Sequence, residues 1–129
     1  MKNLFLYLSL IMVFAVSCFK EAELGYPASV TFSSDGGVRL ITGDIDFTHA
    51  TIQNYKTGDG SSYIMTEDER YSESVEQLEL DWLRVEYGRE HGNEIKIYAE
   101  PNTTGKQRTL HVELYSAYDY DVVRVTQQK

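Results

Sequence analysis

Three tyrosines crowd a short segment near the C-terminal end of the chain, with two aspartates beside them: Tyr115, Tyr118, Asp119, Tyr120 and Asp121. A flat aromatic ring can stack on the apolar face of a ligand such as a sugar, while carboxylate oxygens accept hydrogen bonds from hydroxyl groups. These residue types at this spacing predict a ligand-binding surface, provided that the segment folds with its rings on one side.

An earlier tyrosine, Tyr98, belongs to the same hypothesis. If the last two strands pair around a turn near Ser116 and Ala117, the later tyrosines lie on one outer face with Tyr98 nearby. The ligand contact is then assigned to four residues: Tyr98, Tyr115, Tyr118 and Tyr120. The alternative interpretation is structural, because tyrosine suits half-buried strand surfaces and can simply cover a sheet.

Residues that could catalyse a reaction form no recognisable motif. Nucleophilic catalysis needs a serine or cysteine beside a base, and the three histidines, His49, His91 and His111, lie in unrelated local contexts. A glycosidase needs two carboxylates about 5 to 10 Å apart across a cleft, and this acidic sequence singles out no pair. We therefore expect no enzymatic activity, no catalytic residue, no metal site and no cofactor, and a solvated surface position for His111.

The N-terminal residues are typical of an export signal. Lys2 precedes an apolar run from Leu4 to Val16, which is shorter than the roughly 20 apolar residues that span a bilayer. The run ends in Ala15-Val16-Ser17-Cys18, which resembles the lipobox of bacterial lipoproteins, and Cys18 is the only cysteine. The resemblance implies removal of residues 1–17 and lipidation of Cys18. The alternative is an ordinary cleavable signal followed by an unmodified cysteine.

A lipid on Cys18 would make the membrane a partner and place the protein at the outer membrane or cell surface, or facing the periplasm. Residues 18–27 would form a lipidated tether. Its charged stretch, Phe19-Lys20-Glu21-Ala22-Glu23, is similar to the surface-sorting signal of Bacteroides-group lipoproteins, and a plain polar tether is the alternative.

Composition predicts one acidic domain over residues 28–129. The 129-residue chain has 12 basic and 20 acidic side chains and a net charge of −8, which opposes binding to nucleic acid and to anionic membrane surfaces. After the signal, short alternating runs separated by Gly, Asn and Asp predict an all-β fold, an immunoglobulin-like sandwich of seven to eight short antiparallel strands.

The expected strands include two hairpins and one long strand. The turn Asp35-Gly36-Gly37 should join the first pair of strands, and Thr57-Gly58-Asp59-Gly60 the second. Leu78–Tyr87 should be one strand with Trp82 in the core, although a ligand contact is the alternative for Trp82. The acidic segment Thr66–Gln77 is typical of a solvated loop, and a calcium-binding loop is the alternative.

Several short motifs, taken in order, resemble the BACON domain of Bacteroides-group proteins: Val30-Thr31-Phe32 with Asp35-Gly36-Gly37, Asp81-Trp82-Leu83-Arg84-Val85, Asn102-Thr103-Thr104-Gly105-Lys106-Gln107-Arg108 and Val123-Arg124-Val125-Thr126-Gln127. The resemblance spans residues 28–129 and implies an immunoglobulin-like sandwich that accompanies glycan-degrading enzymes or surface lipoproteins. The tryptophan usual after the first Gly-Gly turn is missing; Asp46-Phe47 lies near that place.

These patterns predict a membrane-anchored lipoprotein whose non-catalytic module binds carbohydrate or acts as a spacer in glycan utilisation. A glycan and other surface proteins are the expected partners, and nucleic acid is not. The alternative is a structural or adhesion protein of the pilus type, in which an exposed strand edge joins another chain.

Overall fold

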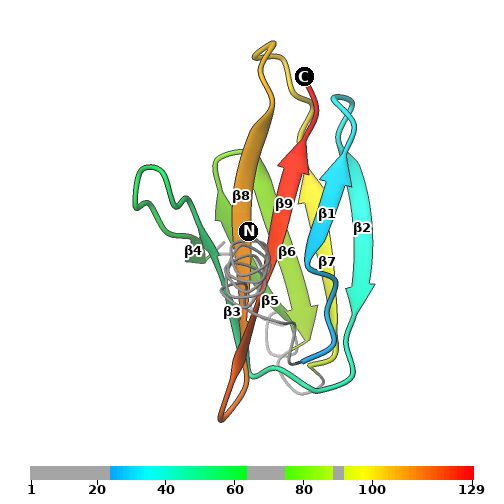
Figure 1. Cartoon of the computed structure of the whole chain (residues 1–129), viewed down its shortest axis with the longest axis vertical. Helices are drawn as coiled ribbons and strands as arrows, with labels where there is room; N and C mark the ends of the chain where they lie inside the picture. The colour runs from blue at the N-terminus through cyan, green and yellow to red at the C-terminus, as the bar shows by residue number, and fades with distance from the viewer. Residues whose placement is uncertain (1–23, 64–74, 89–91) are drawn as a thin grey trace, which may run out of the picture.

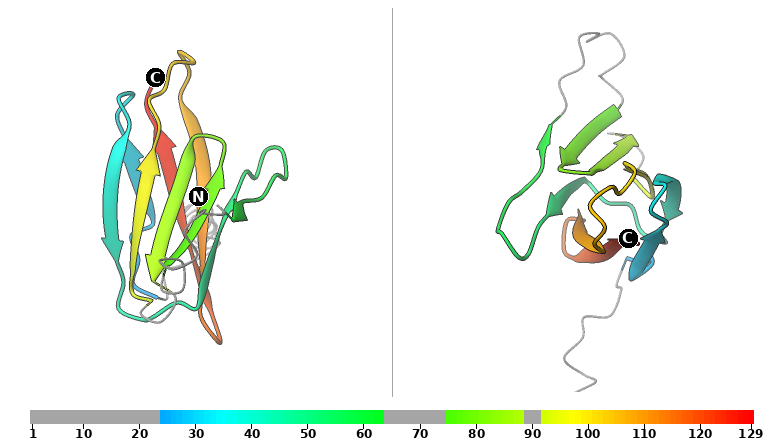
Figure 2. Two further views of the ribbon diagram at one scale, coloured as in Figure 1. Left: turned by 180° about the vertical axis from the view of Figure 1, so that it is seen from behind. Right: turned by 90° about the horizontal axis from the view of Figure 1, so that it is seen from above.

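Two β-sheets lie face to face in the part of the chain that the structure describes (Figure 1, Figure 2). This computed structural model describes residues 24–63, 75–88 and 92–129. Its nine strands are β1 (Ser29–Phe32), β2 (Gly37–Thr42), β3 (His49–Gln53), β4 (Ser62–Tyr63), β5 (Val75–Leu80), β6 (Leu83–Gly88), β7 (Glu94–Ala99), β8 (Arg108–Tyr115) and β9 (Tyr120–Gln127). Within these ranges, no helix has the length and apolar character needed to cross a membrane. The all-β sandwich expected from the sequence is confirmed.

The two sheets contain four and five strands. Their orders are β1-β9-β8-β3 and β2-β7-β6-β5-β4. Neighbouring strands are antiparallel, except that β1 runs parallel to β9. The last two strands pair as predicted, with Tyr115 opposite Tyr120 at the end of the hairpin.

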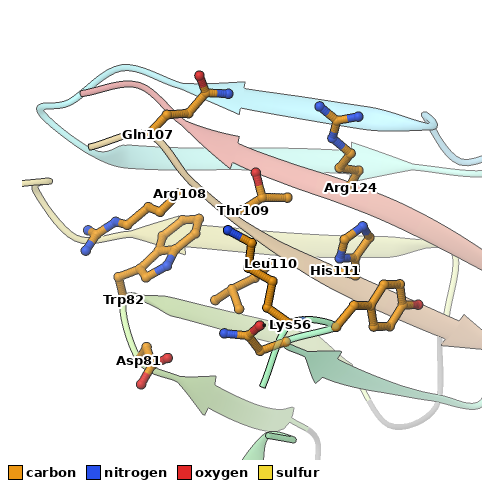
Figure 3. A pocket seen from close by; sticks show the side chains of 11 residues that line it. Lys56, Asp81, Trp82, Gln107, Arg108, Thr109, Leu110, His111 and Arg124 are labelled. Carbon is orange, nitrogen blue, oxygen red and sulfur yellow. Dashed lines mark hydrogen bonds between the residues drawn. The ribbon is translucent and has the colours of Figure 1, made fainter. Parts of the chain in front are cut away.

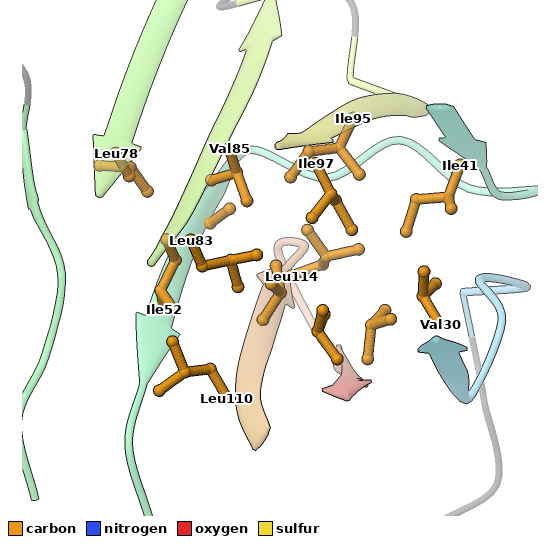
Figure 4. Close-up of a cluster of buried hydrophobic side chains, with 14 of the residues drawn as sticks. Val30, Ile41, Ile52, Leu78, Leu83, Val85, Ile95, Ile97, Leu110 and Leu114 are labelled. Atoms are coloured by element: carbon orange, nitrogen blue, oxygen red, sulfur yellow. The ribbon is translucent and has the colours of Figure 1, made fainter. Parts of the chain in front are cut away.

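Alternating apolar residues build the core between the sheets (Figure 4). In β8, Leu110, Val112 and Leu114 are at most 1% exposed, and Val85 and Ile97 of the other sheet are fully buried. Successive side chains of a strand point to opposite faces. Burial of these residues therefore fixes which side chains of β8 point outward, away from the core.

The first glycine-rich turn does not form a hairpin, contrary to the expectation. Asp35-Gly36-Gly37 connects β1 to β2, which belong to different sheets, so it is a crossover. The segment Thr57–Gly60 does reverse the chain, with an antiparallel bridge between Gln53 and Gly60 and the Ser61 N–H donating to the Ile52 carbonyl, although β4 then pairs with β5 of the other sheet. A tight reversal brings two strands close, but the sheet that each joins depends on pairing with distant strands such as β7 and β9.

The expected long strand Leu78–Tyr87 is instead a hairpin, which explains why nine strands are present. Strands β5 and β6 pair with Leu80 opposite Leu83, leaving Asp81 and Trp82 as the turn. Asp81 adopts a positive φ of 51°, which suits the first central residue of a tight hairpin turn. Trp82 is 7% exposed and packs in the core cluster, as expected.

The N-terminal part of the described chain also packs into the core. Leu24 and Tyr26, within the expected tether 18–27, are each 2% exposed. Their backbone N–H groups donate to the buried Asp121 carboxylate at 3.1 to 3.2 Å. The core therefore includes the end of that segment.

Some residues that the sequence singles out lie on parts of the chain that the structure does not describe. Cys18, with all of residues 1–23, and His91 lie outside the described residues. Most of the acidic segment, residues 66–74, also lies outside them. Its last three residues, 75–77, begin β5, so they are strand and not loop.

Candidate functional site

A row of three stacked rings crosses the outer face of the four-stranded sheet. His49 of β3, Tyr115 of β8 and Tyr120 of β9 lie opposite one another in register. The ring centroids of His49 and Tyr115 are 4.7 Å apart with their planes at 8°, and those of Tyr115 and Tyr120 are 5.8 Å apart at 29°. Tyr115 is therefore covered on both ring faces by its neighbours.

This stacking decides which of the tyrosines in the final hairpin can contact a ligand through a ring face. Tyr115 has none free, and its hydroxyl donates to the Glu113 carboxylate. That hydrogen bond, together with burial, raises the pKa of Tyr115. Tyr120 is 40% exposed and Tyr118, in the turn, is fully exposed, so these two keep ring surface open to solvent.

Tyr98 does not lie near the final hairpin, contrary to the expectation. It belongs to β7 of the five-stranded sheet and points outward, to the opposite side of the sandwich. The guanidinium of Arg84 covers its ring at 4.3 Å from the centroid. The reason is that β7 pairs with β2 and β6, which the local sequence around Tyr98 does not specify.

A second row contains Tyr55, His111 and Arg124. His111 of β8 lies opposite Arg124 of β9, and the Tyr55 ring stacks on the His111 ring with centroids 4.0 Å apart and planes at 16°. Burial raises the pKa of Tyr55 to about 12, and the charge of Glu113 and a hydrogen bond to it act in the same direction. Tyr55 is nevertheless 57% exposed, so its ring stays open to solvent while its hydroxyl end lies near Glu113.

His111 is half-buried, which corrects the expectation of a solvated surface histidine. The strand does point its side chain outward, but Tyr55 covers the ring. Burial lowers the pKa of His111, the charge of Arg124 lowers it further, and Glu113 opposes both. The imidazole is therefore neutral at pH 7, and its Nδ1 atom has no hydrogen-bond partner among the described residues.

An open pocket of about 570 Å³ begins at this second row (Figure 3). The residues that line it come from four places: 54–56 after β3, 81–82 in the β5–β6 turn, 107–111 at the start of β8, and Arg124 of β9. Four segments that are far apart in the sequence thus meet at one end of the sandwich.

Trp82 and Arg108 form one wall of this pocket, where Figure 3 shows them side by side. The Arg108 guanidinium carbon lies 4.7 Å from the Trp82 ring centroid. Arg108 Nε donates to Gln127 Oε1 at 2.8 Å, and Gln127 is fully buried, with its amide donating to the carbonyls of Glu100 and Ser33. This chain of contacts holds Arg108 in place.

The arrangement suits binding. Tyr55 offers an exposed ring whose other face rests on His111, and amide, hydroxyl, guanidinium and carboxylate groups surround the pocket. A few polar groups placed around an apolar surface are typical of sites that recognise polar organic ligands. In the described part of the chain, no group of three or more His, Cys, Asp or Glu side chains is placed to hold a metal ion.

Sequence reasoning missed Tyr55, His111 and Arg124 as members of one site. Tyr55 follows β3, His111 lies in β8 and Arg124 in β9, so only the pairing of these three strands brings them together. The one local signal was the alternation of β8 and β9, which places His111 and Arg124 on the outer face.

Part of the chain is similar to a known family. Residues 71–128 match the family model of the BACON domain, described as "Putative binding domain, N-terminal". The match includes the β5–β6 turn, the start of β8 and Arg124, whereas the 54–56 segment of the pocket precedes it. The matched family is a binding-type domain and not a catalytic one. No curated protein matches the chain.

Two of the solved structures that resemble this chain come from Bacteroides species. A protein from Bacteroides thetaiotaomicron, solved by NMR, superimposes with a TM-score of 0.51 and 16% sequence identity, over 85% of this chain and 88% of that one. The GH5 xyloglucanase of Bacteroides ovatus, in complex with a XXXG heptasaccharide, gives a TM-score of 0.44 and 16% identity, over 82% of this chain and 19% of that one. The first likeness concerns the fold alone.

Proposed function

We propose that this chain is a non-catalytic module whose ligand is a glycan. The proposal starts from the match of residues 71–128 to the BACON family of binding-type domains. The observation that carries the proposal is the pocket beside Tyr55. Sugars combine flat apolar faces with hydroxyl groups, so a site for them needs an accessible ring and several hydrogen-bonding groups.

Tyr55 supplies the accessible ring. It is 57% exposed, and its stacking on His111 holds the ring in one orientation before any ligand arrives. A ring that is already fixed loses little conformational entropy on binding, which favours affinity. Gln107 lines the same pocket and can donate to and accept from sugar hydroxyls, whereas Asn54 can donate through Nδ2 because its Oδ1 accepts from the N–H groups of Lys56 and Thr57.

The proposal extends to a lipid anchor on Cys18, at the outer membrane or cell surface. The lipobox-like sequence supports it, and the position of the pocket is compatible with it. Tyr26, near the first described residue, donates to the carbonyl of Gly92 in the β6–β7 connection, whereas the pocket lies at the β5–β6 turn, the opposite end of β6 (Figure 1). A tether at Leu24 would leave the pocket facing away from the membrane.

Titration of the isotope-labelled full chain, in a detergent without sugar head groups, tests the proposal. Amide shifts would be followed on adding a panel of soluble oligosaccharides. We expect weak binding, near the millimolar range, because stacking contacts are worth on the order of 1 kcal/mol each. Shifts should map to Tyr55, His111 and Arg124.

Two tyrosine variants make this test specific. Tyr55→Ala should abolish the shifts, and Tyr118→Ala, which removes a fully exposed ring away from the pocket, should leave them unchanged. Shifts centred on Tyr118 and Tyr120 would move the site to the final hairpin. An absence of shifts across the panel would favour the spacer role.

One observation favours the alternative role in protein assembly. Strand β2 lies at the edge of the five-stranded sheet, and its Val38 and Leu40 are 57% and 55% exposed. An apolar strand edge can pair with a strand of another chain. A Val38→Lys, Leu40→Lys double variant should then lose association measured by sedimentation, while glycan binding is retained.

A further inference from the structure

The charges around the Tyr55 pocket have the opposite sign to the charge of the whole chain. The chain has 20 acidic and 12 basic side chains, yet the residues that line the pocket include Lys56, Arg108 and Arg124 and one carboxylate, Asp81. The Glu113 carboxylate does not line the pocket, although its charge acts on Tyr55 and His111. A cluster of positive side chains in a negatively charged chain creates a local field that attracts negatively charged ligands.

Acidic neighbours compensate one side of the pocket. The charges of Glu100 and Asp81 act on Arg108, and Arg108 is also bound through Nε and Nη2 to Gln127 and to the carbonyls of Glu100 and Pro101. Arg108 is therefore held and partly neutralised by the protein itself.

Arg124 and Lys56 differ in this respect. Both are exposed, and neither side chain makes a hydrogen bond or an ion pair with any residue in the described ranges. His111 is the neighbour of Arg124 across the strand pair (Figure 3), and it is neutral at pH 7. Within the described ranges, the donors of the Arg124 guanidinium are therefore available to a ligand.

A guanidinium recognises a carboxylate better than a hydroxyl. Its donors form a planar fork that binds both carboxylate oxygens at once, and such charge-assisted hydrogen bonds are about twice as strong as neutral ones. A site that binds only neutral sugars would gain little affinity from an arginine that has no side-chain partner among the described residues.

We propose that the ligand of this pocket is an acidic glycan, in which a uronic acid places its carboxylate on Arg124 while a neighbouring sugar ring stacks on Tyr55. This inference rests on the proposed glycan-binding function and names the class of glycan. Neighbouring strands lie about 4.8 Å apart, and the Tyr55 ring is a further 4.0 Å beyond His111. His111 therefore separates the Tyr55 ring from the strand position of Arg124, and a ligand that touches both side chains spans this gap.

A matched pair of probes tests the charge requirement. One probe is a galacturonate oligosaccharide and the other is the same oligosaccharide with its carboxylates methyl-esterified. The full chain, in the same detergent, should bind the acid form about tenfold more tightly than the ester, the effect expected for a charge-assisted contact. Raising the salt concentration should reduce this preference.

Two arginine variants locate the contact. Arg124→Gln should remove the preference for the acid form while binding of the ester persists. Arg84→Gln changes an arginine on the outer face of the other sheet, where it covers Tyr98, and should leave the preference intact. Both variants should show the amide spectrum of the folded chain.

The outcomes separate this inference from the function it rests on. Equal binding of acid and ester, lost in Tyr55→Ala, would overturn the acidic class and keep glycan binding. Binding of a sulfated oligosaccharide without binding of the galacturonate would also overturn the proposed carboxylate contact. If neither probe nor any neutral oligosaccharide shifted the residues of the pocket, both proposals would fail.

Discussion

Tyr26 shows how much a single buried side chain can hold together in this small sandwich. It is 2% exposed, its ring packs edge-on against Phe47 at 5.8 Å between centroids, and its hydroxyl donates to the carbonyls of Ile45 and Gly92 at 3.0 Å each. Two connections between strands are thereby tied to the N-terminal segment. The Gly92 carbonyl also accepts from the Phe47 N–H, so the loss of the Tyr26 hydroxyl would cost one hydrogen bond shared between two carbonyls.

Tyr26→Phe should lower the free energy of unfolding by about 1 to 2 kcal/mol at pH 7, because it deletes one donor and leaves buried carbonyls with a lost hydrogen bond. Urea unfolding followed by circular dichroism measures this. Tyr118→Phe, at a fully exposed position, is the matched control and should change nothing. An equal stability of the two variants would contradict the role of Tyr26.

The buried hydroxyl of Tyr26 also predicts that the free energy of unfolding depends on pH in the alkaline range. Burial and the charges of Asp46 and Asp121 raise the pKa of Tyr26 to about 12, from a value of 10.0 in an unfolded chain. Between these values the folded state keeps the proton that the unfolded state loses. The stability contributed by the neutral hydroxyl is therefore complete below pH 10 and is lost as the pH rises toward 12. The slope of unfolding free energy against pH in that window should be shallower in Tyr26→Phe.

At the scale of strands, local patterns predicted the elements, whereas distant pairing determined their arrangement. The alternation of Leu110, Val112 and Leu114 predicted β8 and its inner face, and the final hairpin with Tyr115 opposite Tyr120 is confirmed. The break at Asp81 was visible as a change of phase, since Leu78 and Leu80 alternate on even positions and Leu83 and Val85 on odd ones.

The candidate site could be predicted less well than the strands. Four tyrosines were chosen because they crowd the sequence or alternate in a strand, yet Tyr98 lies on the other sheet and Tyr115 is covered on both ring faces. Ring exposure depends on which side chains stand opposite in register. Such a neighbour can come from a strand more than 60 residues away, as in the pair His49 and Tyr115.

The crossover between β1 and β2 gives a prediction at the same scale. Gly36 has a φ of +79°, and a Cβ atom there would lie 2.3 Å from the backbone oxygen of Ala99. Gly36→Ala combines the cost of a left-handed conformation with displacement of β7, so it should lower the unfolding free energy by about 2 to 4 kcal/mol.

Gly58 is the matched control for Gly36. It has a similar φ of +81°, but no atom lies within 4 Å of the position of its Cβ. Gly58→Ala should therefore cost only the conformational term, about 1 to 2 kcal/mol. Equal losses in the two variants, measured by thermal unfolding, would show that the contact with Ala99 is unimportant.

At the scale of the whole molecule, the expected lipid anchor is the feature that decides where the module works. Cys18→Ala should abolish partitioning of the protein into the detergent phase, since the lipobox-like sequence predicts Cys18 as the site of acylation. Labelling with palmitate measures the lipid directly. Equal incorporation in the variant and the natural chain would refute the anchor, and the pocket would then need no orientation relative to a membrane.

The boundary between tether and domain gives the last prediction. The sequence places the domain at residues 28–129, but Leu24 and Tyr26 are core residues and their N–H groups bind the buried Asp121 carboxylate. Burial of a large side chain contributes about 1.5 to 3 kcal/mol. A fragment of residues 28–129 should therefore be less stable than one of residues 24–129 by about 3 to 6 kcal/mol, against the roughly 5 to 15 kcal/mol typical of a whole domain.

Urea unfolding of three fragments, beginning at residues 18, 24 and 28, separates a tether from a structural segment. The fragments beginning at residues 18 and 24 should unfold at the same urea concentration, and both should give a β-type circular dichroism spectrum. The fragment beginning at residue 24 lacks cysteine, so a reductant should not change its unfolding. The fragment beginning at residue 28 should unfold at a much lower concentration, because it loses the side chains that close this end of the core and the donors to Asp121. If all three midpoints coincided, the contacts of Leu24 and Tyr26 would contribute nothing to folding, and the tether would extend to residue 27 as the sequence suggested.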